Sequence, residues 1–117
     1  MYPRANIIVF GLWDGFCGAC DNHSRRMNKM ETMGMQFNRL ANFIRQSDVA
    51  QDADVVFVDL LVDDPGVSKN VIDDLLDKGY KLPFVMINDR VRFTGSINIM
   101  SIYNEAKMIT ENGCMLC

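Results

Sequence analysis

The sequence predicts a single α/β domain in which three helices flank a four-stranded mixed sheet, in the order β-α-β-α-β-β-α. Short apolar runs rich in β-branched residues alternate along the chain with segments whose apolar residues recur every three or four positions. The length of 117 residues suits one packed core and leaves no room for a second domain. We expect one domain over residues 1–110 and a flexible tail over residues 111–117.

The first half of the chain predicts two strands joined by a long helix. Residues 6–13 form an apolar run without polar alternation, which is typical of a strand buried on both faces. Apolar residues then line one face of a helix expected to run roughly from Ala19 to Gln46, with Gly34 as a point of bending or interruption. Residues 54–62 predict the second strand, and the Asp-Pro-Gly sequence at residues 64–66 ends it.

The second half predicts a helix, a hairpin and a last helix. The first of these helices ends at Lys78-Gly79, and residues 84–87 form the third strand. Asn88-Asp89 is a tight turn into a fourth strand over residues 91–94, which implies an antiparallel hairpin. The last helix begins near Gly95-Ser96. Because helices connect the earlier strands, we expect parallel pairing before the hairpin.

Composition excludes two classes of partner. The net charge of -3 is spread along the chain, and no clustered basic surface is visible for binding nucleic acid. The longest apolar run, residues 7–13, is too short to cross a membrane, and a signal peptide would need a longer apolar core. We therefore expect a monomeric, cytoplasmic protein whose cysteines stay mostly reduced.

Cys17 and Cys20 are two thiols placed where the first strand passes into the first helix. A sulfur just ahead of a helix lies near unpaired N–H groups and the positive end of the helix dipole, and both favour the thiolate. Cys17 is therefore expected to be the nucleophile, and Cys20, about one turn on, the thiol that resolves a mixed disulfide. This cycle needs no metal and no tightly bound cofactor, only an external reductant or oxidant.

A second Cys-X-X-Cys, formed by Cys114 and Cys117, ends the chain. It fits a redox tail that exchanges electrons with Cys17 and Cys20, a prenylation box, or a tail without a role. Four thiolates could instead bind zinc or another soft metal, although almost the entire domain separates the two pairs. A non-enzymatic metal-binding module is therefore the main alternative function, and an interaction domain with incidental thiols is a third.

Three elements together resemble the thioredoxin superfamily, in its glutaredoxin-like branch: the Cys17/Cys20 pair, the sequence Lys81-Leu82-Pro83 before the third strand, and Gly95 after the fourth. The resemblance spans nearly the whole chain. It implies a thioredoxin-like fold and a thiol–disulfide oxidoreductase that reduces or exchanges disulfides on proteins or low-molecular-weight thiols. It also implies that Pro83 is cis and packs beside the cysteines, which would let the backbone of Leu82 pair with an extended substrate.

The same resemblance implies an electron donor, either glutathione or a donor of the thioredoxin-reductase type. Residues 94–98 lack the Gly-Gly step and the acidic residues of glutathione-using members, so the glutathione site is only partly carried over.

Trp13 and Phe16 bracket the approach to Cys17, either as core residues or as an apolar rim for a protein partner. With Leu82, Pro83 and Gly95 they form the expected substrate-binding set.

Overall fold

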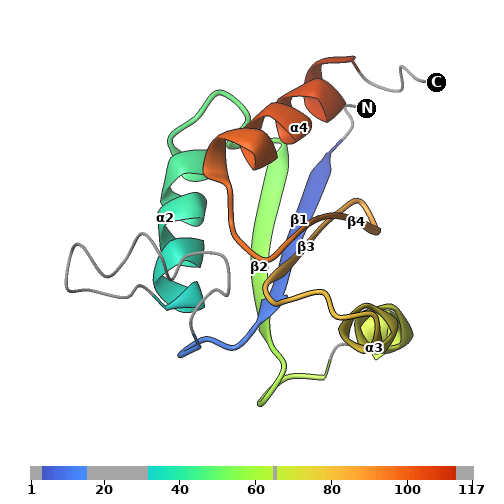
Figure 1. Ribbon diagram of the computed structural model, residues 1–117. Helices are drawn as coiled ribbons and strands as arrows, with labels where there is room; N and C mark the ends of the chain where they lie inside the picture. Colours follow the sequence, from blue (N-terminus) through green and yellow to red (C-terminus); the bar gives the residue numbers. More distant parts are fainter. Residues whose placement is uncertain (1–3, 16–31, 65, 113–117) are drawn as a thin grey trace.

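The computed structural model describes residues 4–15, 32–64 and 66–112. Over these residues it has the expected α/β architecture, with a four-stranded mixed sheet and three helices (Figure 1). A 3₁₀ turn over Gly66–Ser68 precedes the middle helix. The elements are β1 (Ala5–Gly11), α2 (Met33–Arg45), β2 (Ala53–Asp59), α3 (Lys69–Asp77), β3 (Phe84–Ile87), β4 (Arg90–Thr94) and α4 (Ile99–Asn112).

The sheet has the strand order β2-β1-β3-β4. β1 and β2 are parallel, whereas β3 is antiparallel to both of its neighbours, β1 and β4. The expected parallel pairing of the third strand is therefore wrong. The reason is the short α3, whose nine residues span about 14 Å, against about 23 Å for the seven residues of β2. Figure 1 shows α3 end-on beside strands seen from the side, so α3 crosses the strands and the chain enters β3 from the end at which it left β2.

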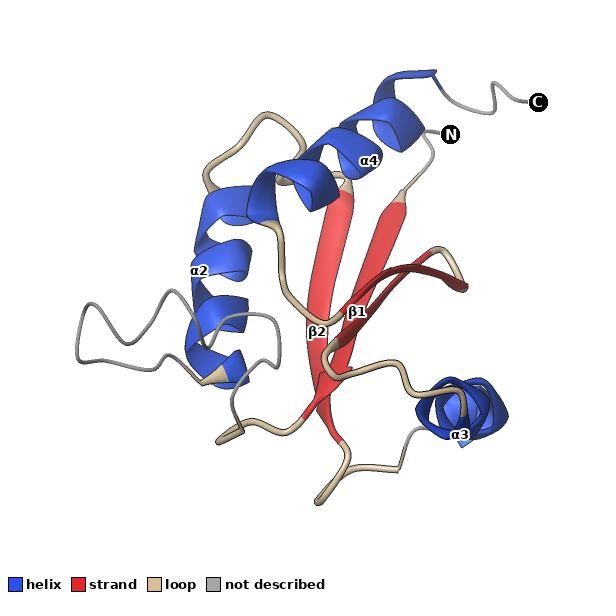
Figure 2. Cartoon of the chain, in the orientation of Figure 1, coloured by secondary structure: helices blue, strands red, loops and turns tan. Residues whose placement is uncertain are grey.

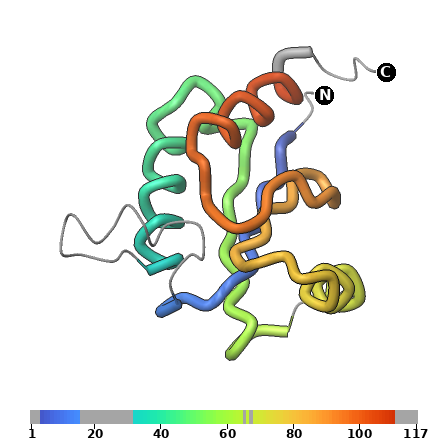
Figure 3. Tube along the Cα trace, in the orientation of Figure 1, coloured from blue at the N-terminus to red at the C-terminus, as the bar shows by residue number. Residues whose placement is uncertain are grey.

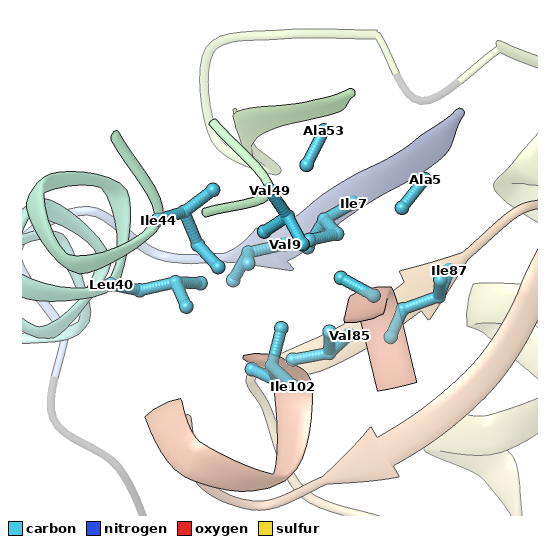
Figure 4. Close-up of a cluster of buried hydrophobic side chains, with 11 residues drawn as sticks. Ala5, Ile7, Val9, Leu40, Ile44, Val49, Ala53, Val85, Ile87 and Ile102 are labelled. Atoms are coloured by element: carbon cyan, nitrogen blue, oxygen red, sulfur yellow. The ribbon is translucent and has the colours of Figure 1, made fainter. Parts of the chain in front are cut away.

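Two buried clusters cover the two faces of the sheet. α2 and α4 lie on one face and α3 on the other (Figure 2). Figure 4 shows the first cluster, in which side chains from β1, α2, β3 and α4 converge. The second joins Ile72 of α3 to Phe10, Phe84 and Met86. Each fully buried aliphatic or aromatic side chain contributes about 1.5–3 kcal/mol relative to exposure, so both faces stabilise the sheet.

The first helix does not run unbroken from Ala19 to Gln46. Thr32 has extended backbone angles (φ -73°, ψ 163°), and its Oγ1 accepts a hydrogen bond from Met35 N at 3.1 Å, which makes it the N-cap of α2. Gly34 lies in the first turn of α2 and causes no bend in the middle of a helix. Residues 16–31 lie outside the described part of the chain.

Several other boundaries differ from the expectation by a few residues. β2 ends at Asp59, because the backbone turns there instead of continuing to residue 62. The hairpin is confirmed: Asn88 (φ 51°) and Asp89 (φ 69°) take the two left-handed positions of a tight turn. α4 starts at Ile99 and runs to Asn112, beyond the predicted tail boundary at residue 111.

The tube trace in Figure 3 shows which segments lie at each end of the sheet. The start of β1 and the end of α4 lie at one end, and the chain leaves β1 and β2 at the other. Among the described residues, no helix combines the length and apolar character needed to cross a membrane.

Candidate functional site

Three pieces of chain meet where β1 and β2 end and β3 begins. Because β1 and β2 are parallel and β3 is antiparallel to β1, their connecting residues must share one end of the sheet. We call this the site end and define it as residues 11–15, 59–64 and 81–83. Leu60 N donates to Gly11 O at 2.9 Å and so ties the residues after β2 to the end of β1.

The start of α2 is fixed against the end of β1. Met33 N donates to Gly15 O at 2.7 Å, and Gly34 N donates to Trp13 O at 2.9 Å. Leu12 N also lies 3.3 Å from Met33 Sδ, which accepts its hydrogen bond. The described residues on either side of the segment that contains Cys17 and Cys20 are therefore held together next to the end of β1. The two cysteines, Phe16, Cys114 and Cys117 all lie outside the described residues.

The first N–H groups of α2 all have partners. Beyond the two bonds just described, Met35 N binds Thr32 Oγ1 and Gln36 N binds Thr32 O at 3.1 Å. We expected unpaired N–H groups of this kind to favour the Cys17 thiolate, because the helix after the cysteines was predicted to begin near Ala19. α2 begins thirteen residues after Cys20 and offers no unpaired donor at its first turn, so it does not supply those hydrogen bonds to a thiolate.

Pro83 is fully buried at the centre of the site end, and the Leu82-Pro83 peptide bond is cis, as the resemblance implies. A Cβ placed on Gly11 would lie 3.5 Å from Pro83 Cβ, so the proline packs directly against the end of β1. Pro83 O accepts a hydrogen bond from Gly95 N at 2.9 Å, and Gly95 has the positive φ of 89° that favours glycine. The structure thus brings Pro83 and Gly95 together, whereas the half-buried Leu82 packs into the α3-side cluster.

Trp13 is both a packed residue and an exposed one. Its ring makes edge-on contacts with Phe57 (centroids 5.0 Å apart, 86°) and with Phe37 (6.1 Å, 60°). The ring also covers Gly34, where a Cβ would lie only 2.5 Å from Trp13 Cδ2. With 36% of its surface exposed at the site end, Trp13 packs against core residues and also offers apolar surface to solvent, so both alternatives from the sequence analysis, a core residue and an apolar rim, remain open.

The sequence interpretation missed two residues at the site end. Leu61 and Val62 were expected to continue the second strand, yet they lie in the turn after β2 and are 81% and 79% exposed. The Asp residues on both sides of them were the signal that could have identified the turn.

A polar cluster lies at the opposite end of the sheet, between the α2–β2 connection and α4. Tyr103 Oη donates to Asp48 Oδ1 at 2.7 Å, and Lys107 forms an ion pair with the same carboxylate. The hydrogen bonds from Lys107 and Tyr103 lower the pKa of Asp48, and the bond to Asp48 raises the pKa of Tyr103. This cluster joins two elements and faces away from the site end. Within the described ranges, no group of three or more His, Cys, Asp or Glu residues is placed to hold a metal ion.

The fold and the site end define an α/β domain built on a four-stranded mixed sheet. No protein-family model and no curated protein matches the sequence. The chain is similar to a solved structure of a protein of unknown function, SA0789, from Staphylococcus aureus, with a TM-score of 0.63 and 16% identity. The match covers 92% of this chain and 94% of that chain. At this identity it establishes the fold alone.

Proposed function

We propose that this protein is a thioredoxin-like thiol–disulfide oxidoreductase of the glutaredoxin-like branch, with Cys17 and Cys20 as its redox pair. The observation that carries the proposal is that the residues flanking the cysteine-containing segment, Trp13 and Gly15 before it and Met33 and Gly34 after it, are hydrogen-bonded to one another at the end of β1. The strand order β2-β1-β3-β4, with one parallel and two antiparallel pairings, supports the thioredoxin-like topology.

The proposed reaction transfers two electrons to a disulfide substrate. The Cys17 thiolate attacks one sulfur of the substrate, the substrate S–S bond breaks, and the other substrate sulfur leaves as a thiolate that takes up a proton. Cys20, as its thiolate, then attacks Cys17 Sγ in the mixed disulfide and releases the second substrate sulfur as a thiolate. The protein ends with a Cys17–Cys20 disulfide, and an external dithiol or two glutathione molecules reduce it again.

Described residues have definite roles in this proposal. Trp13 gives the exposed apolar surface next to the residues that lead to Cys17, and Pro83, held by Gly95, closes the opposite side of the β1 end. The substrate is a disulfide of a protein or of a low-molecular-weight thiol, and the donor is glutathione or a donor of the thioredoxin-reductase type. A reducing compartment such as the cytoplasm suits this cycle.

Titration against a glutathione redox buffer, with bound metal quantified in parallel, tests the proposal. We expect a reversible Cys17–Cys20 disulfide without metal, loss of disulfide reduction in Cys17→Ser, and accumulation of a mixed disulfide in Cys20→Ser. The variant Cys114→Ser/Cys117→Ser is the matched control, and unchanged turnover would leave the tail without a redox role. Stoichiometric zinc that protects all four thiols would overturn the enzyme in favour of the metal-binding module.

A further inference from the structure

The turn after β2 holds two neighbouring aliphatic side chains out into solvent. Leu61 N donates to Asp59 Oδ1 and Val62 N to Asp59 O, both at 3.0 Å. Asp63 closes the turn from the other side: its N donates to Asp59 O at 2.7 Å, and its Oδ2 accepts from Asp59 N at 3.0 Å. Single exposed aliphatic residues are common on protein surfaces, but this pair is presented by a turn in which every backbone N–H group from Asp59 to Asp63 donates a hydrogen bond.

This turn lies at the same end of the sheet as residues 11–15, which precede the proposed redox pair in the sequence. The hydrogen bond from Leu60 N to Gly11 O places it next to the end of β1, from which the chain continues through Trp13 towards Cys17. Trp13 adds a further exposed apolar surface at this end. A partner that contacts Leu61 and Val62 would therefore lie close to the residues that lead to the cysteines.

Carboxylates share the site end with the apolar pair, and Asp63 and Asp64 follow it directly in the chain. Asp14, Asp63 and Asp64 are exposed, and none of them forms an ion pair with another described residue. Lys69, whose charge acts on Asp64, bonds Asp73 instead at 2.8 Å. Lys81, a cation at this end, stands at the β3 entry, on the other side of β1. Among the described residues, the turn after β2 is thus apolar at Leu61 and Val62 and carries two carboxylates immediately after them.

We propose that Leu61 and Val62 form a docking surface for the substrate protein, and that the preferred substrate is an extended apolar segment flanked by basic residues near its disulfide. This inference rests on the proposed function and narrows it from disulfides in general to those of proteins with such a segment. Apolar contact with a preformed turn supplies affinity at a low ordering cost, and the opposite charges steer the encounter. A small disulfide is too short to use either feature.

Steady-state reduction of matched substrates tests this proposal. The probes are two synthetic peptides that contain one disulfide and the same apolar segment, flanked by Lys in one and by Glu in the other, together with bis(2-hydroxyethyl) disulfide. In Leu61→Ser/Val62→Ser we expect the KM for the Lys-flanked peptide to rise about tenfold, with unchanged turnover of the small disulfide. The control Met108→Ser removes an exposed apolar side chain from α4, away from the site end, and should change neither the KM for the peptide nor the turnover of the small disulfide.

A second variant tests how much the carboxylates contribute to the preference for the Lys-flanked peptide. Asp14→Asn/Asp64→Asn keeps the size of both side chains, and the amide oxygen introduced by Asp64→Asn can still accept the hydrogen bond from Gly66 N. We expect this variant, and raised ionic strength, to abolish the preference for the Lys-flanked peptide. Equal KM values for the wild type and Leu61→Ser/Val62→Ser, or a preference for the Glu-flanked peptide, would overturn the docking surface.

A binding measurement separates the two proposals. Fluorescence anisotropy of a labelled Lys-flanked peptide with Ser in place of both cysteines reports docking without chemistry. Binding that depends on Leu61 and Val62, in a protein that reduces no disulfide, would retain the docking surface and refute the oxidoreductase. Turnover of the small disulfide without peptide binding would retain the oxidoreductase and refute the docking surface. A dimer that Leu61→Ser/Val62→Ser converts to a monomer would identify a second copy of this chain as the occupant and overturn the substrate assignment.

Discussion

Gly34→Ala should destabilise this protein, although the same change usually stabilises a helix. Alanine is favoured over glycine by about 1 kcal/mol inside a helix. Here, however, the new Cβ would lie 2.5 Å from Trp13 Cδ2 and Cε2, well inside van der Waals contact. The indole must then move away from Phe37 and Phe57.

The size of the effect follows from these contacts. Overpacking of this kind costs about 1–3 kcal/mol, and each of the two aromatic pairs lost is worth about 0.5–1.5 kcal/mol. After subtraction of the helix gain, we expect the free energy of unfolding to fall by about 3 kcal/mol. Urea denaturation followed by circular dichroism measures this change. Trp13 is the only tryptophan in the chain, so its fluorescence separately reports the displacement of the ring.

Two further variants test whether the contact with Trp13 determines the effect of Gly34→Ala. Asn38→Ala, at an exposed position of α2, gains helix propensity without a clash and should stabilise by about 0.5 kcal/mol. In a Trp13→Leu background the indole is absent, so Gly34→Ala should become neutral or stabilising. Stabilisation by Gly34→Ala in the wild-type protein, or an equal loss with and without the indole, would show that the contact with Trp13 does not govern this position.

Three more predictions concern the scaffold. Thr32→Ala removes the side-chain cap of α2 and should lower the free energy of unfolding by about 1 kcal/mol in urea denaturation, whereas Thr32→Ser should retain most of it. The hydrogen bond from Lys107 lowers the pKa of Asp48 below its ordinary value of 3.8. The ionised carboxylate therefore stabilises the folded protein fully at pH values above 3.8, and this stabilisation is lost as the pH falls through the lowered pKa. Melting temperatures measured across acidic pH should therefore fall more steeply for the wild type than for Asp48→Asn, and parallel curves would contradict this assignment. Asn88 has a φ of 51°, and its Oδ1 accepts a hydrogen bond from Asn6 N at 2.7 Å. Asn88→Ala removes this hydrogen bond and leaves a residue that disfavours the left-handed conformation, so we expect the free energy of unfolding to fall by about 2 kcal/mol in thermal or urea unfolding. Asn88→Gly removes the backbone strain but also lacks the hydrogen bond, so it should restore only a small part of this loss, and full restoration would contradict the role of the side chain.

Local signals in the sequence were sufficient for the hairpin and for the ends of some elements. Phe84–Ile87 was predicted with its observed bounds, because a proline precedes it and a turn of Asn88-Asp89 follows it. Gly79 ends α3 with a positive φ of 91°, as its position after the apolar stripe indicated. Each of these features depends on the backbone preferences of one or two residues, which the sequence states directly.

Features that depend on distant parts of the chain were not predictable in the same way. The direction of β3 follows from how α3 lies on the sheet, and the apolar pattern of α3 is the same whether the helix runs along the strands or across them. The packing of Trp13 on Gly34 joins residues from two separate elements, so neither residue type indicates it alone. Leu61 and Val62 were assigned to a strand because both are apolar and Val62 is β-branched, and these preferences were given more weight than the turn-forming Asp residues beside them.

The hydrogen bonds between Gly15 and Met33 and between Trp13 and Gly34 close the chain upon itself on either side of residues 16–31. The four strands and the described residues of both buried clusters come from the chain before and after that closure. A graft between Gly15 and Thr32 would keep the hydrogen bonds at both of its ends, so we expect the intervening sequence to be exchangeable as one unit. The stability of the described scaffold can thus be measured separately from the residues in which the redox pair is proposed. The similarity to SA0789 at 16% identity shows that this fold accommodates wide change in sequence.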